Sequence, residues 1–206
     1  LRGTGRHLIM VTGRELEELL VVFPQAHFFS RIVAENGALL YNPASKQIKT
    51  LAEKPPETFI AELKKRKVQP MSVGHVIVAA WKPHETALLE AIRDHALELQ
   101  VIFNKDAVMV LPAGVNKASG LKHALDELEL SPHEVIGVGG AENDHAFLSI
   151  CECSVPVDNA LPTLKERADI VTSGDHGRGV EQLIEEILKN DLKDFEPRLT
   201  RHRLLL

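Results

Sequence analysis

Short apolar runs alternate with helix-period segments at the start of the chain. Residues 7–11 form an apolar run, and Leu16, Leu19 and Leu20 then recur at helical spacing until Pro24. Residues 32–34 form a second apolar run, which ends at Glu-Asn-Gly. An order of strand, helix and strand is typical of a βαβ unit with a parallel sheet. The first forty residues therefore predict part of an α/β fold.

The middle of the chain shows a different pattern. Apolar runs that flank short polar turns predict two hairpins, at residues 38–51 and 101–111. Between them we expect one strand over residues 73–81 and two amphipathic helices over residues 56–66 and 84–97. Their inward-facing residues are Phe59, Ile60 and Leu63 in the first helix and Leu88, Leu89 and Ile92 in the second. These elements predict a small α+β module.

The α/β pattern returns after Pro112. Helices are expected over residues 118–128, 144–149, 161–167 and 179–192, and strands over residues 135–138, 154–157 and 169–172. The sequence thus predicts a Rossmann-like α/β core of residues 1–38 and 112–192, interrupted by the α+β insert of residues 39–111.

Residues 193–206 form a basic tail, with Arg198, Arg201 and Arg203, that ends on three leucines. The chain begins with Leu1, in what has the character of a helix end. We therefore expect both ends to continue into further chain, and the tail to connect to a fused downstream domain or to support self-association.

Composition narrows the class of protein. Hydrophobic residues make up 44% and charged residues 26% of the 206 residues, which is ordinary for a soluble globular protein. A net charge of −5 without a long basic run argues against nucleic acid as a partner. There is no apolar segment of membrane-spanning length and no secretory h-region. Cys151 and Cys153 are too close to staple a secreted domain, so we expect a reducing, cytoplasmic location.

The most informative stretch covers residues 135–148. An apolar strand ends at Gly139 and Gly140, and Glu142, Asn143 and Asp144 follow before a helix begins. Ligands bind at the carboxyl ends of parallel strands, and oxygen-bearing side chains there suit a hard cation. The alternative is that Asn143 or Asp144 only caps the helix.

Three motifs resemble those of a known family. They are Val11-Thr12-Gly13-Arg14, then Pro112-x-Gly-Val-Asn-Lys117, then Gly139-Gly-Ala-Glu-Asn-Asp144. They resemble the second, third and fourth motifs of the haloacid dehalogenase (HAD) superfamily. Asp158-Asn-Ala160 and Gly177-Arg-Gly-Val180 are similar to its Cof-type, sugar-phosphatase-like branch. The resemblance covers nearly all of residues 6–190 and implies a HAD core whose insert is a mobile C2-type cap.

The resemblance also implies roles for individual residues. Thr12 would bind phosphate oxygens, with Gly13 and Arg14 beside it, and Lys117 would neutralise the transferring phosphoryl group. Asn143 would contact the substrate and Mg²⁺, and Asp144 would bind Mg²⁺ or orient Lys117. These residue types suit phosphoryl transfer, which depends on positioning and on charge neutralisation.

The implied function is Mg²⁺-dependent hydrolysis of a small phosphorylated metabolite, such as a sugar phosphate, through an aspartyl-phosphate. Each role has a structural alternative. Thr12 could be a helix N-cap, Lys117 a solvated surface lysine, and Arg14 a surface residue in the first turn of a helix.

Two departures from the family pattern affect activity. The family nucleophile belongs to an Asp-x-Asp-Gly-Thr motif, which these 206 residues lack. We expect it in a preceding segment or another chain, unless the chain is a fragment. The fourth motif normally has Gly-Asp where this chain has Gly139-Gly140, which removes a metal-binding carboxylate. The 206 residues alone are therefore expected to be inactive, and the rival function is a catalytically dead HAD-like domain that binds a ligand or regulates a fused domain.

The Gly140→Asp variant of the 206-residue chain should show no phosphatase activity, because a restored metal ligand does not supply a nucleophile. Phosphate release from a phosphomonoester, measured with and without Mg²⁺, checks this expectation. Mg²⁺-dependent turnover by this single variant would contradict it.

Overall fold

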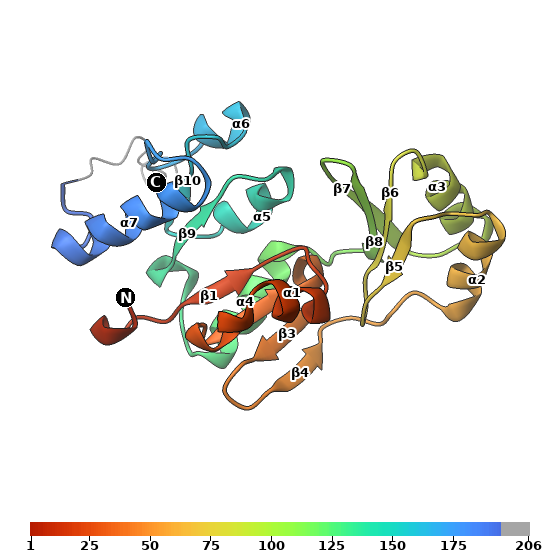
Figure 1. Ribbon diagram of the computed structural model, residues 1–206, viewed down its shortest axis with the longest axis horizontal. Coiled ribbons are helices and arrows are strands. Elements are labelled where there is room, and N and C mark those ends of the chain that lie inside the picture. The colour runs from red at the N-terminus through yellow and green to blue at the C-terminus, as the bar shows by residue number, and fades with distance from the viewer. Residues whose placement is uncertain (195–206) are drawn as a thin grey trace, which may run out of the picture. The chain divides into compact units, whose positions relative to one another are not determined.

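The structure is a computed structural model that describes residues 1–194, so the predicted tail lies outside the described residues except for its first two (Figure 1). The chain divides into two compact units, which are described separately. The N-terminal unit is His7–Leu128, and the C-terminal unit combines Leu1–Arg6 with the residues from Glu129 onward.

The first sheet of the N-terminal unit has the strand order β1-β2-β3-β4. Its strands are β1 (Ile9–Val11), β2 (Arg31–Ala34), β3 (Leu39–Asn42) and β4 (Gln47–Thr50). Strand β1 is parallel to β2, with Val11 opposite Val33, and the other pairs are antiparallel. The 3-10 helix η2 (Pro24–Phe28) precedes β2, and the 3-10 turn η3 (Glu35–Gly37) joins β2 to β3.

Both faces of the inner strands β2 and β3 are covered, whereas β4 is exposed. Ile32 and Leu39 pack against Leu16 and Leu19 of helix α1 (Leu16–Val22). On the opposite face, Val33 packs with Leu40 and with Ala124 of α4 (Lys117–Glu127). Successive residues of β2 thus point into opposite cores, as the period of a strand requires. Two-sided burial explains why this strand is a continuous apolar run.

The second sheet has the order β5-β6-β8-β7 and is antiparallel throughout. Its strands are β5 (Met71–Val73), β6 (Val78–Trp81), β7 (Leu99–Asn104) and β8 (Ala107–Pro112). Helices α2 (Glu57–Lys65) and α3 (Glu85–Asp94) pack on one face (Figure 1). The predicted inward residues of α2 are buried, but Leu89 of α3 is 52% exposed and Ala91 takes the inner position. The prediction for Leu89 was therefore wrong.

Two further predictions for this unit need correction. The strand expected over residues 73–81 is a hairpin, because the chain turns at Gly74, whose N–H donates to the Ile77 carbonyl (2.9 Å). The hairpin at residues 38–51 does form, as β3 and β4, but it extends the first sheet and does not join the elements of the expected insert. The turn at Gly74 was not predicted, because an unbroken apolar run begins soon after it, at Val76. The division into core, cap and tail stays a prediction.

The C-terminal unit contains a two-stranded parallel sheet of β9 (Ile136–Gly139) and β10 (Cys153–Pro156). Its helices are α5 (His145–Leu148), α6 (Pro162–Lys165) and α7 (His176–Asn190), with 3-10 turns η1 (Arg2–Thr4), η4 (Pro132–Glu134) and η5 (Glu142–Asp144). Val155 of β10, Ile170 and two residues of α7 form its core.

The strand predicted over residues 169–172 is not a regular strand. The N–H groups of Asp169 and Ile170 both donate to the Ser154 carbonyl (3.1 and 3.2 Å), and that of Thr172 donates to Pro156. The Asp169 carboxylate in turn accepts hydrogen bonds from the Ser154 backbone and hydroxyl. Residues 169–172 are thus hydrogen-bonded to β10, but the side-chain bonds of the buried Asp169 replace the regular backbone ladder of a strand.

The predicted α/β class, with parallel sheet segments and helices, is confirmed. Within residues 1–194, no helix combines the length and apolarity needed to cross a membrane.

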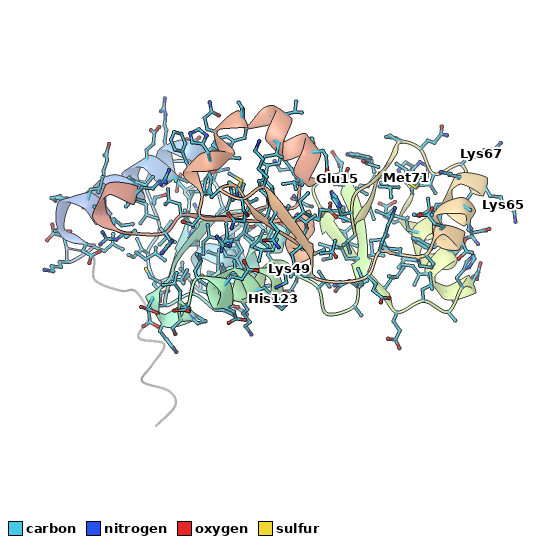
Figure 2. The ribbon with its side chains drawn as sticks, turned by 90° about the horizontal axis from the view of Figure 1, so that it is seen from below. Glu15, Lys49, Lys65, Lys67, Met71 and His123 are labelled. Carbon is cyan, nitrogen blue, oxygen red and sulfur yellow. The ribbon has the colours of Figure 1, made fainter. Side chains whose placement is uncertain are left out.

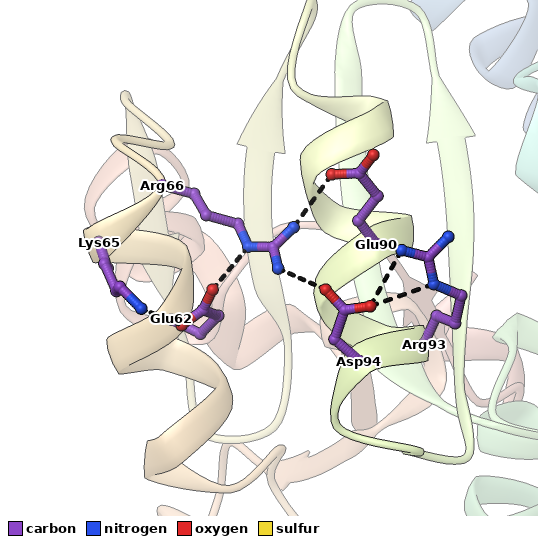
Figure 3. A network of polar contacts seen from close by, with 6 residues as sticks. All are labelled: Glu62, Lys65, Arg66, Glu90, Arg93 and Asp94. Carbon is purple, nitrogen blue, oxygen red and sulfur yellow. Dashed lines mark hydrogen bonds and ion pairs between the residues drawn. The ribbon is translucent and has the colours of Figure 1, made fainter.

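A polar network joins α2 to α3 (Figure 3). Arg66 follows α2, and its guanidinium bonds Glu62 on the same helix (2.8 Å) and both Glu90 (3.1 Å) and Asp94 (2.7 Å) on α3. The hydrogen bonds from Arg66 lower the pKa of the Glu62 and Asp94 carboxyl groups. Two of these three ion pairs, with Glu90 and Asp94, join α2 to α3.

Arg66→Gln should lower the thermal unfolding midpoint at pH 7 by about 2–4 °C. Carboxyl groups with a depressed folded-state pKa contribute stability above their unfolded pKa, near 4, and lose it as the pH falls through the folded value. The deficit should therefore be smaller at pH 3 than at pH 7. Arg93→Gln is the control, because Arg93 bonds a single carboxylate in the network. A deficit of equal size at pH 3 and pH 7 would contradict this account.

Candidate functional site

The Thr12 turn lies at the carboxyl end of β1. The Thr12 N–H donates to the Val33 carbonyl (2.8 Å), and the Thr12 carbonyl accepts from the Asn36 N–H (3.0 Å). Its hydroxyl oxygen accepts from the N–H of Arg14 (3.2 Å). Helix α1 has Glu15 as its N-cap, so Thr12 is not the helix cap that the alternative interpretation required. Because the hydroxyl oxygen is an acceptor within the turn, its proton can be donated to a ligand.

Gly13 and Arg14 complete this turn. Gly13 is half-buried and brings no side chain, which leaves room for close approach of a ligand to the backbone. The Arg14 side chain is exposed and forms an ion pair with Glu18, one helical turn along. That arrangement matches the alternative of a surface residue, and a role for Arg14 in binding stays a prediction.

Lys117 is the first residue of α4, and it is buried with 5% of its surface exposed. Asn116 caps the helix: its side-chain oxygen accepts from the N–H groups of Ala118 (2.9 Å) and Ser119 (3.0 Å). The Asn116 N–H donates to the Ser119 hydroxyl (3.0 Å), which completes a capping box. The cap therefore satisfies the N–H groups of Ala118 and Ser119. The Lys117 ammonium brings a positive charge to the same end of the helix. Its burial is incompatible with a solvated surface lysine.

The η3 turn contacts both the Thr12 turn and the start of α4. Glu35 donates its N–H to the Arg14 carbonyl (2.9 Å), next to the bond between Asn36 and Thr12. Gly37 has a φ of 106°, and a Cβ there would lie 1.9 Å from the Asn116 carbonyl oxygen. Only glycine fits this contact. The turn therefore touches both the Thr12 turn and the residue before Lys117.

Asp144 and Asn143 lie in the C-terminal unit, after β9. Asp144 is 7% exposed, and its Oδ2 accepts the N–H groups of Gly140 and Ala141 (2.8 Å each). No side chain caps α5, so Asp144 fixes the preceding loop and does not cap the following helix. A Cβ on Gly139 would lie 2.7 Å from the same oxygen, so the loop needs glycine there. Asn143 is half-buried in η5. Their roles in binding stay predictions.

The loop offers oxygen donors of the kind that Mg²⁺ prefers, namely one carboxylate and one amide. Gly140 adds no third donor, and a Cβ there would lie 3.0 Å from Val157 Cγ2 and 3.3 Å from the Ala160 Cβ. Mg²⁺ keeps several waters and uses one or two carboxylates, so the donor set fits a sparsely coordinated ion.

A second group of potential metal ligands lies in the N-terminal unit. Ligand atoms of Glu17, Glu35 and His75 all lie within 4.8 Å of one another. His75 Nε2 and Glu17 Oε1 are 2.8 Å apart, and the Glu35 carboxylate accepts three backbone N–H groups. Glu17 and His75 therefore bond each other, and the Glu35 carboxylate bonds the backbone. Sequence reasoning missed Glu35, since a glutamate before Asn-Gly is typical of an exposed turn.

Two acidic residues near the start of α1, Glu15 and Glu17, have shifted pKa values. Burial raises the pKa of Glu15, and the charges of Glu35, Glu18 and Glu17 add to this, against a hydrogen bond with Ser72. Burial alone would raise the pKa of Glu17. The hydrogen bond and the electrostatic attraction between Glu17 and His75 outweigh that effect, so the pKa of Glu17 is lowered. At neutral pH the ionised Glu15 is therefore a source of instability.

Glu15→Gln should raise the thermal midpoint at pH 7 by about 1–3 °C. A group with a raised folded-state pKa contributes its full stability below its unfolded pKa and loses it as the pH rises through the folded value. The gain should consequently disappear below about pH 4. Glu18→Gln, at an exposed ion pair, is the control and should give no gain. Lower stability of Glu15→Gln at pH 7 would refute the assignment.

Comparison with known proteins shows which family this chain resembles. The model of a family of haloacid dehalogenase-like hydrolases matches residues 70–184, more than half of the chain. Phosphoglycolate phosphatase of Methanothermobacter thermautotrophicus is 31% identical over 198 residues, which are 91% of this chain and 87% of that protein. Phosphoglycolate phosphatase 2 of Saccharolobus solfataricus is 30% identical and covers 89% and 78%.

Solved structures show the same fold at lower identity. A haloacid dehalogenase-like hydrolase from Bacteroides thetaiotaomicron has a TM-score of 0.74 at 17% identity, over 90% of this chain and 88% of that one. The sucrose-phosphatase of Synechocystis sp. PCC6803 has a TM-score of 0.66 at 17% identity, over 90% and 86%. The motifs, the family match and these relatives agree, and the chain belongs to the haloacid dehalogenase-like hydrolase family.

Proposed function

We propose that the chain is a phosphomonoester hydrolase whose N-terminal unit binds the phosphoryl group of a small phosphorylated metabolite. The observation that carries the proposal is the η3 turn, which bonds Thr12 and contacts Asn116, the residue before the buried Lys117. The ammonium and the start of the helix are both positive, so this position favours an anionic ligand. Phosphate is such an anion, and the relatives named above are phosphatases.

The proposed roles follow from these positions. The Thr12 hydroxyl donates to a phosphate oxygen, the backbone at Gly13 allows close approach, and the Lys117 ammonium neutralises charge on the phosphoryl group. Arg14 lies at the rim, where it contacts an anionic substrate after release from Glu18. Such a site acts through positioning and electrostatic stabilisation.

Mg²⁺ is the metal that we propose for the C-terminal unit, with Asp144 and Asn143 as its protein ligands. When bound, the ion would offset the negative charge of phosphoryl oxygens. The Asp144 carboxylate is buried after β9, where hydrogen bonds from the loop hold it in place. Asn143 also contacts the substrate in this proposal.

For the substrate we propose a phosphorylated small acid of the phosphoglycolate type before a sugar phosphate. Two relatives with at least 30% identity are named for phosphoglycolate, whereas the sucrose-phosphatase shares the fold alone. A cytoplasmic location and a small-molecule partner belong to this proposal, as does a fused domain or a second copy at the tail. Neither nucleic acid nor a membrane is expected as a partner.

A second candidate function is favoured by Gly140. This position carries no carboxylate, and its surroundings are tight for any side chain. A domain that binds phosphate but does not hydrolyse phosphomonoesters would have this property. Both candidates predict phosphate binding, and they differ in whether Mg²⁺ strengthens it and supports turnover.

Lys117→Met should weaken the binding of orthophosphate, the reaction product, by about ten- to a hundredfold, because a charge-assisted contact is lost. Isothermal titration calorimetry with orthophosphate measures this. Lys122→Met is the matched control, since Lys122 is an exposed lysine on the same helix and should bind normally. Circular dichroism would confirm that both variants fold. Equal affinity of the native chain and Lys117→Met would remove Lys117 from the site.

The same titration in the presence of Mg²⁺ separates the two candidates. For a phosphatase, Mg²⁺ should tighten orthophosphate binding, and Asp144→Asn should abolish that gain. Binding that does not respond to Mg²⁺ would favour the non-catalytic domain.

A further inference from the structure

Glu35 has a fully buried side chain, with 0% of its surface exposed. Its carboxylate accepts the backbone N–H groups of His75 (2.9 Å), Val76 (2.7 Å) and Ile77 (2.9 Å). Consecutive amides that converge on one anion resemble the concave anion sites formed by backbone turns. A buried carboxylate without such donors would be strongly destabilising, so this contact holds the β5–β6 turn firmly.

The β5–β6 turn is shaped for this carboxylate. A Cβ on Gly74 would lie 2.7 Å from Glu35 Oε1 and 2.9 Å from Ile77 Cγ2. A larger residue at position 74 would therefore push the carboxylate out of its place. The fit is specified from both sides, by a glutamate on η3 and a glycine in the hairpin.

The backbone of Glu35 makes the second half of the connection. Glu35 and Asn36 have positive φ values of 50° and 56°, a conformation that side-chain-bearing residues adopt rarely. In this conformation their N–H groups reach the carbonyls of Arg14 and Thr12. The strained turn thus bonds the Thr12 turn through its backbone while the Glu35 side chain bonds the hairpin.

Two other acidic residues contact the same hairpin. Glu15, labelled in Figure 2 where α1 approaches β5, is hydrogen-bonded to Ser72, and Glu17 is paired with His75. Both are at least partly exposed, and exposed pairs contribute little. Of these three acidic residues, Glu35 alone is fully buried.

We propose that Glu35 is a positioning residue. It couples the β5–β6 turn to the proposed phosphate-binding residues, so that movement of one is transmitted to the other. Loss of its carboxylate frees the hairpin and at the same time loosens the Thr12 turn and the start of α4. This inference rests on the proposed function only where phosphate binding is concerned. The mechanical coupling can be tested without it.

The test compares the native 206-residue chain with three variants. Glu35→Gln places an amide NH₂ against backbone donors, and Gly74→Ala crowds the carboxylate without altering Glu35. Glu53→Gln replaces an exposed glutamate and is the control. Amide hydrogen exchange, followed by mass spectrometry, reports local opening, and calorimetric titration with orthophosphate reports binding.

Both test variants should accelerate exchange at least tenfold in residues 75–77, 12–14 and 116–118, and leave the β7–β8 hairpin at the native rate. Orthophosphate affinity should fall at least fivefold in both, and Glu53→Gln should match the native chain in every respect. A role confined to the hairpin would not change exchange in residues 12–14 or the affinity.

Acceleration in residues 75–77 alone would overturn the proposal, as would uniform acceleration across His7–Leu128, which indicates only general destabilisation. A native chain that does not bind orthophosphate would contradict the proposed function. In that case the exchange pattern would still decide whether Glu35 couples the two turns.

Discussion

The N-terminal unit depends on the close packing of the η3 turn against its neighbours. Gly37 lies against the Asn116 carbonyl with no space for a Cβ, and Asn36 bonds Thr12. The end of β1 and the start of α4, far apart in the sequence, are thereby held to one turn. The proposed phosphate site needs a hydroxyl donor and a cation at fixed positions, and this contact would fix Thr12 and the start of α4 relative to each other.

Periodicity was sufficient to predict most elements of the fold. Buried strands such as β2 and amphipathic helices such as α2 have patterns that follow directly from which faces are covered. Predictions were wrong where tertiary contacts overrode the local pattern. The turn at Gly74 is set by the Glu35 carboxylate, which lies far away in the sequence, and the segment at Asp169 is set by a buried side-chain bond to Ser154.

The candidate site was proposed for a different reason, and the binding roles of its residues stay predictions. Thr12 and Lys117 follow recognisable motifs, and the structure gives each a setting that local sequence supports, namely a strand end and a capping box. The capping box Asn116-x-x-Ser119 could be recognised from sequence, but the burial of Lys117 could not. Glu35 was missed because burial and partners determine its importance, and neither is visible in a short polar turn.

The family places this chain among hydrolases, while Gly140 offers no carboxylate to a metal ion. The N-terminal unit holds the elements proposed to bind phosphate, and the C-terminal unit holds those proposed to bind the metal. Phosphate binding is therefore the property shared by the catalytic and non-catalytic interpretations, and it is the central claim of the account.

An orthophosphate titration followed by amide NMR of the native chain tests that claim most directly. The account predicts saturable shifts that concentrate in residues 12–15 and 116–118, because the proposed ligand would contact the Thr12 hydroxyl and the Lys117 ammonium. Saturable shifts centred elsewhere in the chain, or no saturable shift at all, would contradict it.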